Sequence, residues 1–145
     1  MNNSNIINTL CVNFGFNINE FTHYLKKSDT TYIKPRGLPA LEDPEQVYRL
    51  KNFKKLQVYG YSITGGKMYF LCDKLQSAHI NLIAKYSDIE DVADRISNQI
   101  NHKPSITISE KGYKRYKWNL SNDFLYIGTK DNERITLIQS LSEIY

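Results

Sequence analysis

The most constraining feature of the sequence is a change of hydrophobic period between residues 87 and 141. The segment 88–102 spaces its apolar residues along one face of a helix with a period of 3.6 residues. These residues are Ile89, Val92, Ala93, Ile96 and Ile100. Pro104 then opposes continuation of the helix. From residue 105 onward the apolar positions alternate with a period of two, which is typical of strands. We therefore expect one amphipathic helix, at 88–102, to cover a sheet.

Two local signals mark the start of this helix. Ser87 and Glu90 have the spacing of a capping box. Asp88 and Asp91 place negative charge in the first turn, where the helix dipole favours it. Both signals predict a helix that begins near residue 88.

The remainder of the chain after residue 55 predicts about seven short strands. Leu56–Ile63 and Met68–Cys72 flank Thr64–Lys67, whose two glycines are a hairpin signal. After a turn at Asp73–Ser77, a third strand is predicted at Ala78–Tyr86. The four strands after the helix contain Ile106 and Ile108, Tyr113–Leu120, Phe124–Thr129 and Ile135–Ser140. Such meanders predict the α+β class with antiparallel strands, in one sheet or two.

Residues 1–55 are predicted to be helical or irregular. Ser4 and Asn17 can cap two short helices within residues 4–27. These helices either pack on the sheet or form a DNA-binding helix-turn-helix. Residues 32–41 contain two prolines and a glycine and predict a loop, and Asp43–Glu45 predicts a helix that runs to about Asn52. We expect residues 1–145 to form a single domain.

The net charge and the cysteines bear on the protein's binding partners and on its cellular compartment. The formal net charge of +4 is spread along the chain and is a weak argument for nucleic-acid binding. Cys11 and Cys72 lie in apolar runs, which favours free thiols in a reducing compartment. The sequence shows no signal-peptide pattern and no apolar segment of about 20 residues. We expect a cytoplasmic protein without a membrane partner.

The motifs that usually carry catalysis are missing from the sequence. It contains no nucleophile elbow, zinc-protease motif, phosphate-binding loop or dinucleotide fingerprint. His23, His79 and His102 fall in different predicted elements, and none has metal-ligand spacing to another histidine, cysteine or acid. We expect a protein that is not an enzyme and uses no cofactor or metal. An enzyme whose site is assembled from scattered residues is the alternative hypothesis.

One predicted strand carries a face that could bind a macromolecule. Tyr113, Arg115 and Lys117 alternate on it, and Lys111 and Lys114 flank them. Aromatic and basic side chains together can bind nucleic acid. Tyrosine and arginine are also enriched at the energetic centres of protein interfaces. A solvated sheet face whose charges prevent edge pairing explains the pattern too.

The predicted partner-binding set extends beyond that strand. Tyr59 and Tyr61 form a similar stripe, which would enlarge the surface if their face is not buried. The complete set is Tyr113, Arg115, Lys117, Tyr59, Tyr61, Lys34 and Arg36.

A series of elements between Gly60 and Leu141 gives the chain a family resemblance. The series is Met68–Leu71, Asp73–Leu75, the helix Ile89–Ile100, Pro104, Tyr116–Trp118 and a closing apolar strand. It resembles small bacterial immunity proteins that neutralise toxins of contact-dependent competition systems. The resemblance implies a cytoplasmic, non-catalytic inhibitor that binds another protein, a toxin or effector. A nucleic-acid-binding protein that uses residues 4–27 or the Tyr113–Lys117 face is the alternative.

Overall fold

The computed structural model describes residues 25–32, 44–51, 53–71, 74–121 and 123–143. The strands in these ranges are β1 (Leu25–Tyr32), β2 (Pro44–Leu50), β3 (Gln57–Val58), β4 (Tyr61–Leu71), β5 (Lys74–Lys85), β6 (Ser105–Ile108), β7 (Lys114–Asn119), β8 (Phe124–Thr129) and β9 (Arg134–Ser140). The helical segments are η2 (Phe53–Lys55), η3 (Tyr86–Asp88) and α3 (Ile89–Ile100). This is an α+β fold, as predicted from the sequence.

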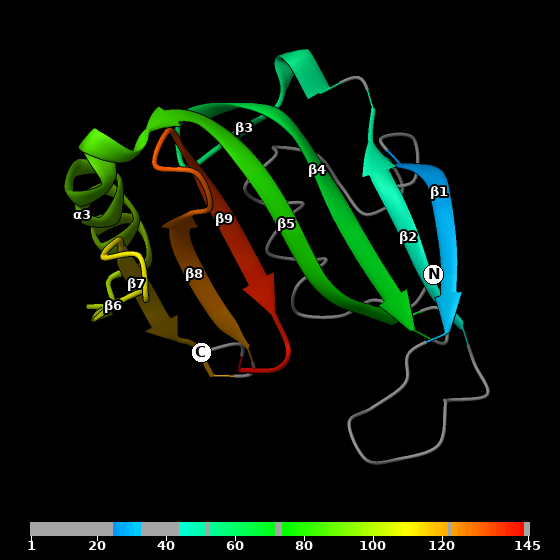
Figure 1. Cartoon of the computed structure of the whole chain (residues 1–145). Helices are drawn as coiled ribbons and strands as arrows, with labels where there is room; N and C mark the ends of the chain where they lie inside the picture. The colour runs from blue at the N-terminus through cyan, green and yellow to red at the C-terminus, as the bar shows by residue number, and fades with distance from the viewer. Residues whose placement is uncertain (1–24, 33–43, 52, 72–73, 122, 144–145) are drawn as a thin grey trace.

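All the described strands belong to one antiparallel sheet (Figure 1). The strand order is β1-β2-β4-β5-β9-β8-β7-β6, and β3 pairs with β4 outside this path. After β5 the chain forms α3, enters β6 at the far edge and returns through β7 and β8 to β9. The last strand therefore lies between β5 and β8, and it joins the two halves of the sheet.

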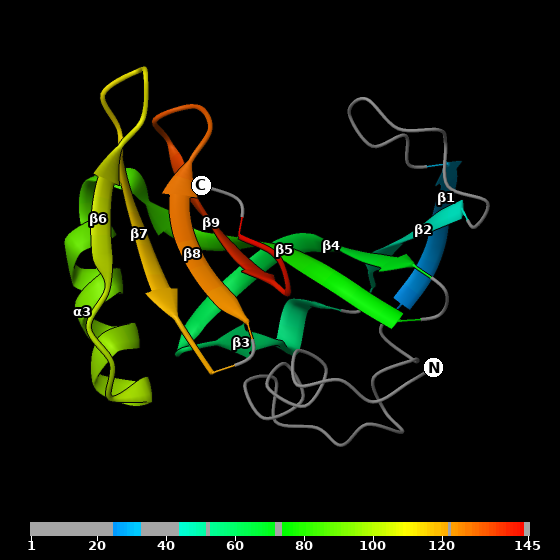
Figure 2. The ribbon, with the colours of Figure 1, turned by 90° about the horizontal axis from the view of Figure 1, so that it is seen from below.

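The helix α3 covers one face of the sheet at the β6–β7 end (Figures 1 and 2). Its buried residues are Ile89, Val92, Ala93 and Ile96, which confirms the predicted apolar stripe. The indole nitrogen of the fully buried Trp118 on β7 donates hydrogen bonds to Ser97 Oγ at 3.1 Å and to the His102 carbonyl at 3.2 Å. Trp118 therefore ties the sheet to the end of the helix.

The ends of α3 differ slightly from the prediction. Asp88 is the N-cap residue, and its side chain makes no capping hydrogen bond. Ser87 lies within η3, so it does not occupy the N-cap position that the predicted capping box with Glu90 requires. The helix ends at Ile100 because Asn101 adopts a left-handed conformation with φ of 53°. No helix in the described part of the chain is long and apolar enough to cross a membrane.

The predicted hairpin at Thr64–Lys67 is wrong. β4 runs through this segment without turning, and the turn lies earlier, at Tyr59 and Gly60, where φ is 51° and 84°. Two consecutive positive φ angles are typical of a tight hairpin turn. Gly66 serves a different purpose, since a Cβ atom on it would lie 2.8 Å from the His79 carbonyl oxygen. Gly66 therefore allows β4 to approach β5 closely, whereas Gly65 has a φ of 146° and lies at the register shift that follows Ile63.

Strands replace the predicted helix at residues 43–52 and the end of the predicted helix pair at residues 4–27. Residues 44–50 form β2 because they pair with β1 on one side and β4 on the other. Pro44 occupies the first position of that strand, where a missing N–H group is tolerated. The end of the predicted helix pair, Leu25–Lys27, belongs to β1. The remainder of that pair, residues 4–24, and both cysteines lie outside the described residues.

The predicted strand Leu56–Ile63 is wrong, because the turn at Tyr59 and Gly60 divides it into β3 and the start of β4. The rest of the strand prediction holds with one exception. The four strands after the helix are confirmed as β6, β7, β8 and β9. The predicted turn at Asp73–Ser77 is wrong from Lys74 onward, because β5 already begins there. In β5 the apolar residues Ala78, Ile80 and Leu82 are buried, as the alternation predicted. Among the residues that the structure describes, one buried cluster extends from Leu50 on β2 to Trp118 on β7.

Candidate partner-binding surface

The register of the strands divides the sheet into two faces. Directly paired residues of neighbouring antiparallel strands project on the same side, and successive residues alternate between sides. The helix face is the side on which Trp118 contacts α3, and it also carries Leu125. The outer face is the opposite side, and it carries Lys117 and the residues paired with it. Among the described elements, α3 contacts β5, β7 and β8 on the helix face.

A row of basic residues crosses the outer face at one register position per strand. Starting from β7, each residue of the row pairs with the next, in the order Lys117, Tyr126, Ile138, His79, Lys67, Arg49 and Lys26. We call the five members Lys26, Arg49, Lys67, His79 and Lys117 the basic row. Neighbouring strands are about 4.8 Å apart, so a row that crosses seven strands is about 29 Å long. Basic groups from distant parts of the sequence thus form one line.

The part of this row on β7, β8 and β9 is packed rather than open. Tyr126 is 1% exposed and Ile138 is 8% exposed, although the helix lies on the other side of the sheet. Lys117 places its Nζ atom 5.1 Å from the centre of the Phe124 ring, and it also forms an ion pair with Glu143. Lys117, Phe124 and Tyr126 therefore pack together on the outer face of β7 and β8.

His79 lies in a positively charged environment. It is half-buried, and its ring packs edge-on against Tyr69 with 4.9 Å between ring centres. Burial lowers the pKa of His79, and the positive charges of Lys130 and Lys67 lower it further. Burial and both lysines act in the same direction because each disfavours a second positive charge. His79 is therefore held neutral at physiological pH.

The structure brings together two of the predicted site residues, Arg115 and Lys117. Both lie on the outer face of β7, and Gly128 on β8 leaves space for Arg115, whose Cγ would be 3.4 Å from a Cβ at that glycine. Tyr113 precedes β7 and packs against Tyr86 of η3, with 5.4 Å between ring centres. The aromatic member of the predicted trio is thus already in contact with another ring.

The other predicted residues do not extend this surface. Tyr59 is 5% exposed and belongs to the core, so the face on which it was predicted to bind a partner is the buried one. Tyr61 is half-buried, and the guanidinium carbon of Arg95 lies 4.9 Å from its ring centre. Lys34 and Arg36 lie outside the described residues.

Sequence reasoning missed Lys67, His79 and Arg49. The sequence pattern predicts a turn at Lys67 and a helix at Arg49. The alternation in β5 did place His79 opposite the apolar residues, which is the signal that it faces outward. Its alignment with Lys117 depends on β9 lying between β5 and β8, which no local pattern reveals.

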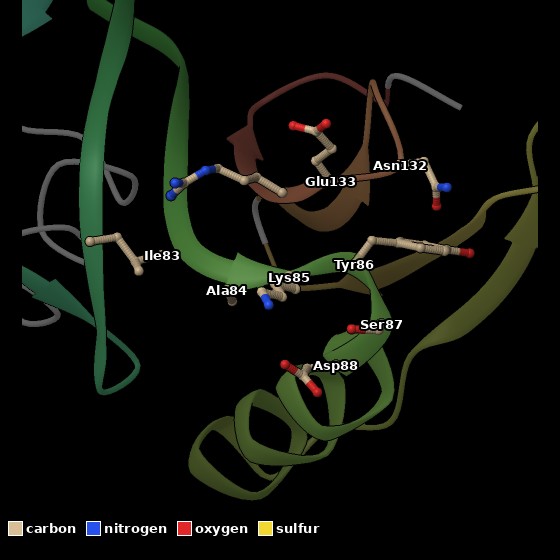
Figure 3. Close-up of a pocket in the computed structure, with 9 residues that line it drawn as sticks. Ile83, Ala84, Lys85, Tyr86, Ser87, Asp88, Asn132 and Glu133 are labelled. Atoms are coloured by element: carbon tan, nitrogen blue, oxygen red, sulfur yellow. The ribbon is translucent and has the colours of Figure 1, made fainter.

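A hollow on the surface forms where β5 separates from β9. The register shifts between Asn81 and Lys85, and the hollow lies at this break, between β5, η3 and the turn before β9 (Figure 3). Its charged residues, Lys85, Asp88, Glu133 and Arg134, are all exposed. Water and salt screen these charges from one another. Within the described residues, no three side chains of His, Cys, Asp or Glu are placed to hold a metal ion.

Comparison with protein-family models, with curated proteins and with solved structures finds no match for this chain.

Proposed function

We propose that this chain is a cytoplasmic inhibitor, of the kind represented by immunity proteins, that binds an acidic surface of a toxin or effector protein across the outer face of its sheet. The observation that carries the proposal is the basic row, in which five strands contribute one positive or protonatable side chain each. Such a line of charge favours rapid and selective association with a surface of opposite sign.

The packing of the outer face favours a protein partner over single-stranded nucleic acid. Nucleobases bind such surfaces by stacking on exposed aromatic rings. Here Tyr126 is buried, the Phe124 ring is covered by Lys117, and the Tyr69 ring contacts His79. A folded partner needs only complementary charge and shape at this surface, so it does not require the rings to be free.

Co-expression tests the proposal directly. The partner to use is the product of the reading frame next to the gene for this chain, and the readouts are cell growth and a complex in size-exclusion chromatography. We expect the wild-type chain to protect cells and to form the complex. Lys67→Glu should weaken binding about tenfold or more, because contacts with a charged group contribute about 1.5–3 kcal/mol.

The matched control is Lys103→Glu, which changes the charge equally at an exposed lysine between α3 and β6. This variant should protect cells as well as the wild type does. Circular dichroism must show that both variants are folded. Equal protection by the two variants would remove the outer face from the proposal, and failure of the wild type to bind or protect would refute an inhibitory function toward that partner.

Nucleic acid is the alternative outcome, and a labelled 20-nucleotide oligothymidine tests it. Fluorescence anisotropy at several salt concentrations should show little binding. Tight binding that weakens steeply with salt, with a smaller slope in Lys67→Glu, would replace the protein-inhibitor proposal with a nucleic-acid-binding one.

A further inference from the structure

Lys67 and His79 form a pair of basic side chains on the outer face. They lie directly opposite each other on β4 and β5. Side chains in such positions have Cβ atoms about 4.5–5.5 Å apart, and like charges there repel. The chain therefore tolerates the pair by keeping His79 neutral, in agreement with the lowered pKa of its ring.

The surroundings of this pair supply positive charge but no carboxylate among the described neighbours. Facing His79 are Lys67 and Tyr69 from β4, and Lys130 acts on it from the turn after β8. β9 contributes Ile138, which does not titrate. Tyr69 holds the imidazole edge-on, so the ring is oriented before any partner arrives. These groups prepare a site for an anion.

We propose that the Lys67–His79 pair is the carboxylate-binding site of the outer face and that His79 takes up a proton when a partner's Asp or Glu side chain occupies it. This inference rests on the proposed function, since it names the chemical group with which an acidic partner would engage the face. A carboxylate next to the ring favours the charged imidazolium and removes the repulsion between the two cations. Binding and proton uptake are then linked, so affinity rises as the pH falls.

The sign of this linkage follows from the two states of the chain. In the free protein the pKa of His79 is below its ordinary value of 6.5. In the complex the carboxylate raises it, so the complex holds more protons than the separate molecules at pH values between the two pKa values. Lowering the pH through this range therefore strengthens binding. In the free chain the same lowered pKa weakens the fold as the pH falls below 6.5, because the unfolded chain is protonated first.

A labelled decaaspartate peptide is the probe for the test, because its carboxylates remain ionised down to about pH 5.5. Binding to the full-length chain is measured by fluorescence anisotropy at pH 8 and at pH 5.5 in low salt. We expect the affinity to be about threefold to tenfold higher at pH 5.5. In an NMR titration that follows the ring carbon resonances of His79, the pKa of His79 should be higher with the peptide than without it.

Two histidine variants make the test specific. His79→Gln should bind the peptide at pH 8 as the wild type does and gain nothing at pH 5.5. His102→Gln, at an exposed position after α3, should keep the full gain. An unchanged His79 titration in the presence of bound peptide, or an equal gain in His79→Gln, would overturn the inference and leave the proposed inhibitor function standing. Absence of peptide binding at both pH values would also overturn the inference about the Lys67–His79 pair. The proposed inhibitor function is tested separately, by the co-expression experiment.

Discussion

At the scale of single residues, Gly66 shows how little space the centre of the sheet leaves. A Cβ atom on it would lie 2.8 Å from the His79 carbonyl oxygen and 3.0 Å from Leu50 Cδ1. The first of these neighbours is backbone, so it cannot move without disturbing β5. Gly128 provides a contrast, because the nearest atom to its Cβ would be Arg115 Cγ at 3.4 Å, in a flexible side chain. A methyl group added at Gly66 would therefore clash with backbone, whereas one added at Gly128 would contact a side chain that can move.

We predict that Gly66→Ala lowers the free energy of unfolding by about 1–3 kcal/mol, the usual cost of inserting a methyl group into a packed region. Gly128→Ala should change it by less than about 1 kcal/mol, since Arg115 can shift. Urea denaturation of the two variants measures the difference. Equal stability of Gly66→Ala and the wild type would show that β4 and β5 can separate more easily than the structure implies.

Asp131 organises the turn between β8 and β9. Its Oδ1 atom accepts hydrogen bonds from the backbone N–H of Glu133 at 3.0 Å and of Arg134 at 3.4 Å. These bonds, in that order of importance, lower the pKa of the Asp131 carboxyl from its ordinary value of 3.8. An anion at this point in the turn therefore holds the two backbone N–H groups that lead into β9.

The lowered pKa of Asp131 predicts a pH dependence of stability. Its contribution should be fully present above pH 3.8, the ordinary value for the unfolded chain, and should disappear as the pH falls through the lower pKa of the folded state. A carboxyl-detected NMR titration should give a pKa below 3.8 for Asp131. A value at or above 3.8 would show that the turn does not hold the carboxylate in this geometry.

At the scale of elements, α3 is held by a narrow apolar stripe and by Trp118. Ile96 is fully buried in the centre of that stripe, whereas Gln99, one turn later, is exposed. Removing buried methyl groups costs the transfer free energy of the lost atoms and leaves a cavity. Substitutions on the buried face of α3 should therefore lower the stability of the protein, and substitutions on its exposed face should not.

Ile96→Ala is expected to lower the free energy of unfolding by about 2–5 kcal/mol. Gln99→Ala, the control on the wet side of the same helix, should stay within about 0.5 kcal/mol of the wild type. Chemical denaturation followed by Trp118 fluorescence measures both. A loss below about 1 kcal/mol for Ile96→Ala would mean that α3 is not packed on the sheet as described.

The elements that could be predicted from the sequence are those in which local pattern and tertiary pairing agree. α3 and β6 to β9 have clear periods and are separated by polar turns such as Lys130–Glu133. β2 was misassigned because Pro44 after an aspartate imitates a helix start, while its pairing with β1 and β4 is invisible in the chain. β4 was divided because Gly65 and Gly66 imitate a turn.

The candidate surface was predictable only in part, for a related reason. The outward direction of Arg115 and Lys117 follows from alternation within one strand. The basic row joins residues from strands that are distant in sequence, and their order in the sheet depends on the insertion of β9 between β5 and β8. Local pattern can therefore assign a residue to a face but cannot align it with residues of other strands.

At the scale of the whole molecule, the sheet has two ends but one core. Leu50 on β2 and Trp118 on β7 lie at opposite ends and belong to the same buried cluster, which runs through β4, β5, β9 and β8. Because the long strands β4 and β5 carry this cluster across the molecule, the described strands should unfold as one unit. The alternative is a sheet whose ends melt separately, each with its own local stability.

Leu50→Ala distinguishes these possibilities, because it creates a cavity at the end of the sheet that is remote from the single tryptophan. If the core is one unit, the loss of about 2–5 kcal/mol at Leu50 is shared by the whole sheet. The urea midpoint reported by Trp118 fluorescence should then fall by the same amount as the midpoint reported by far-ultraviolet circular dichroism. An unchanged fluorescence midpoint beside a lowered dichroism midpoint would show that the α3 end folds independently of β1 and β2. In that case the basic row would span two units rather than one rigid surface.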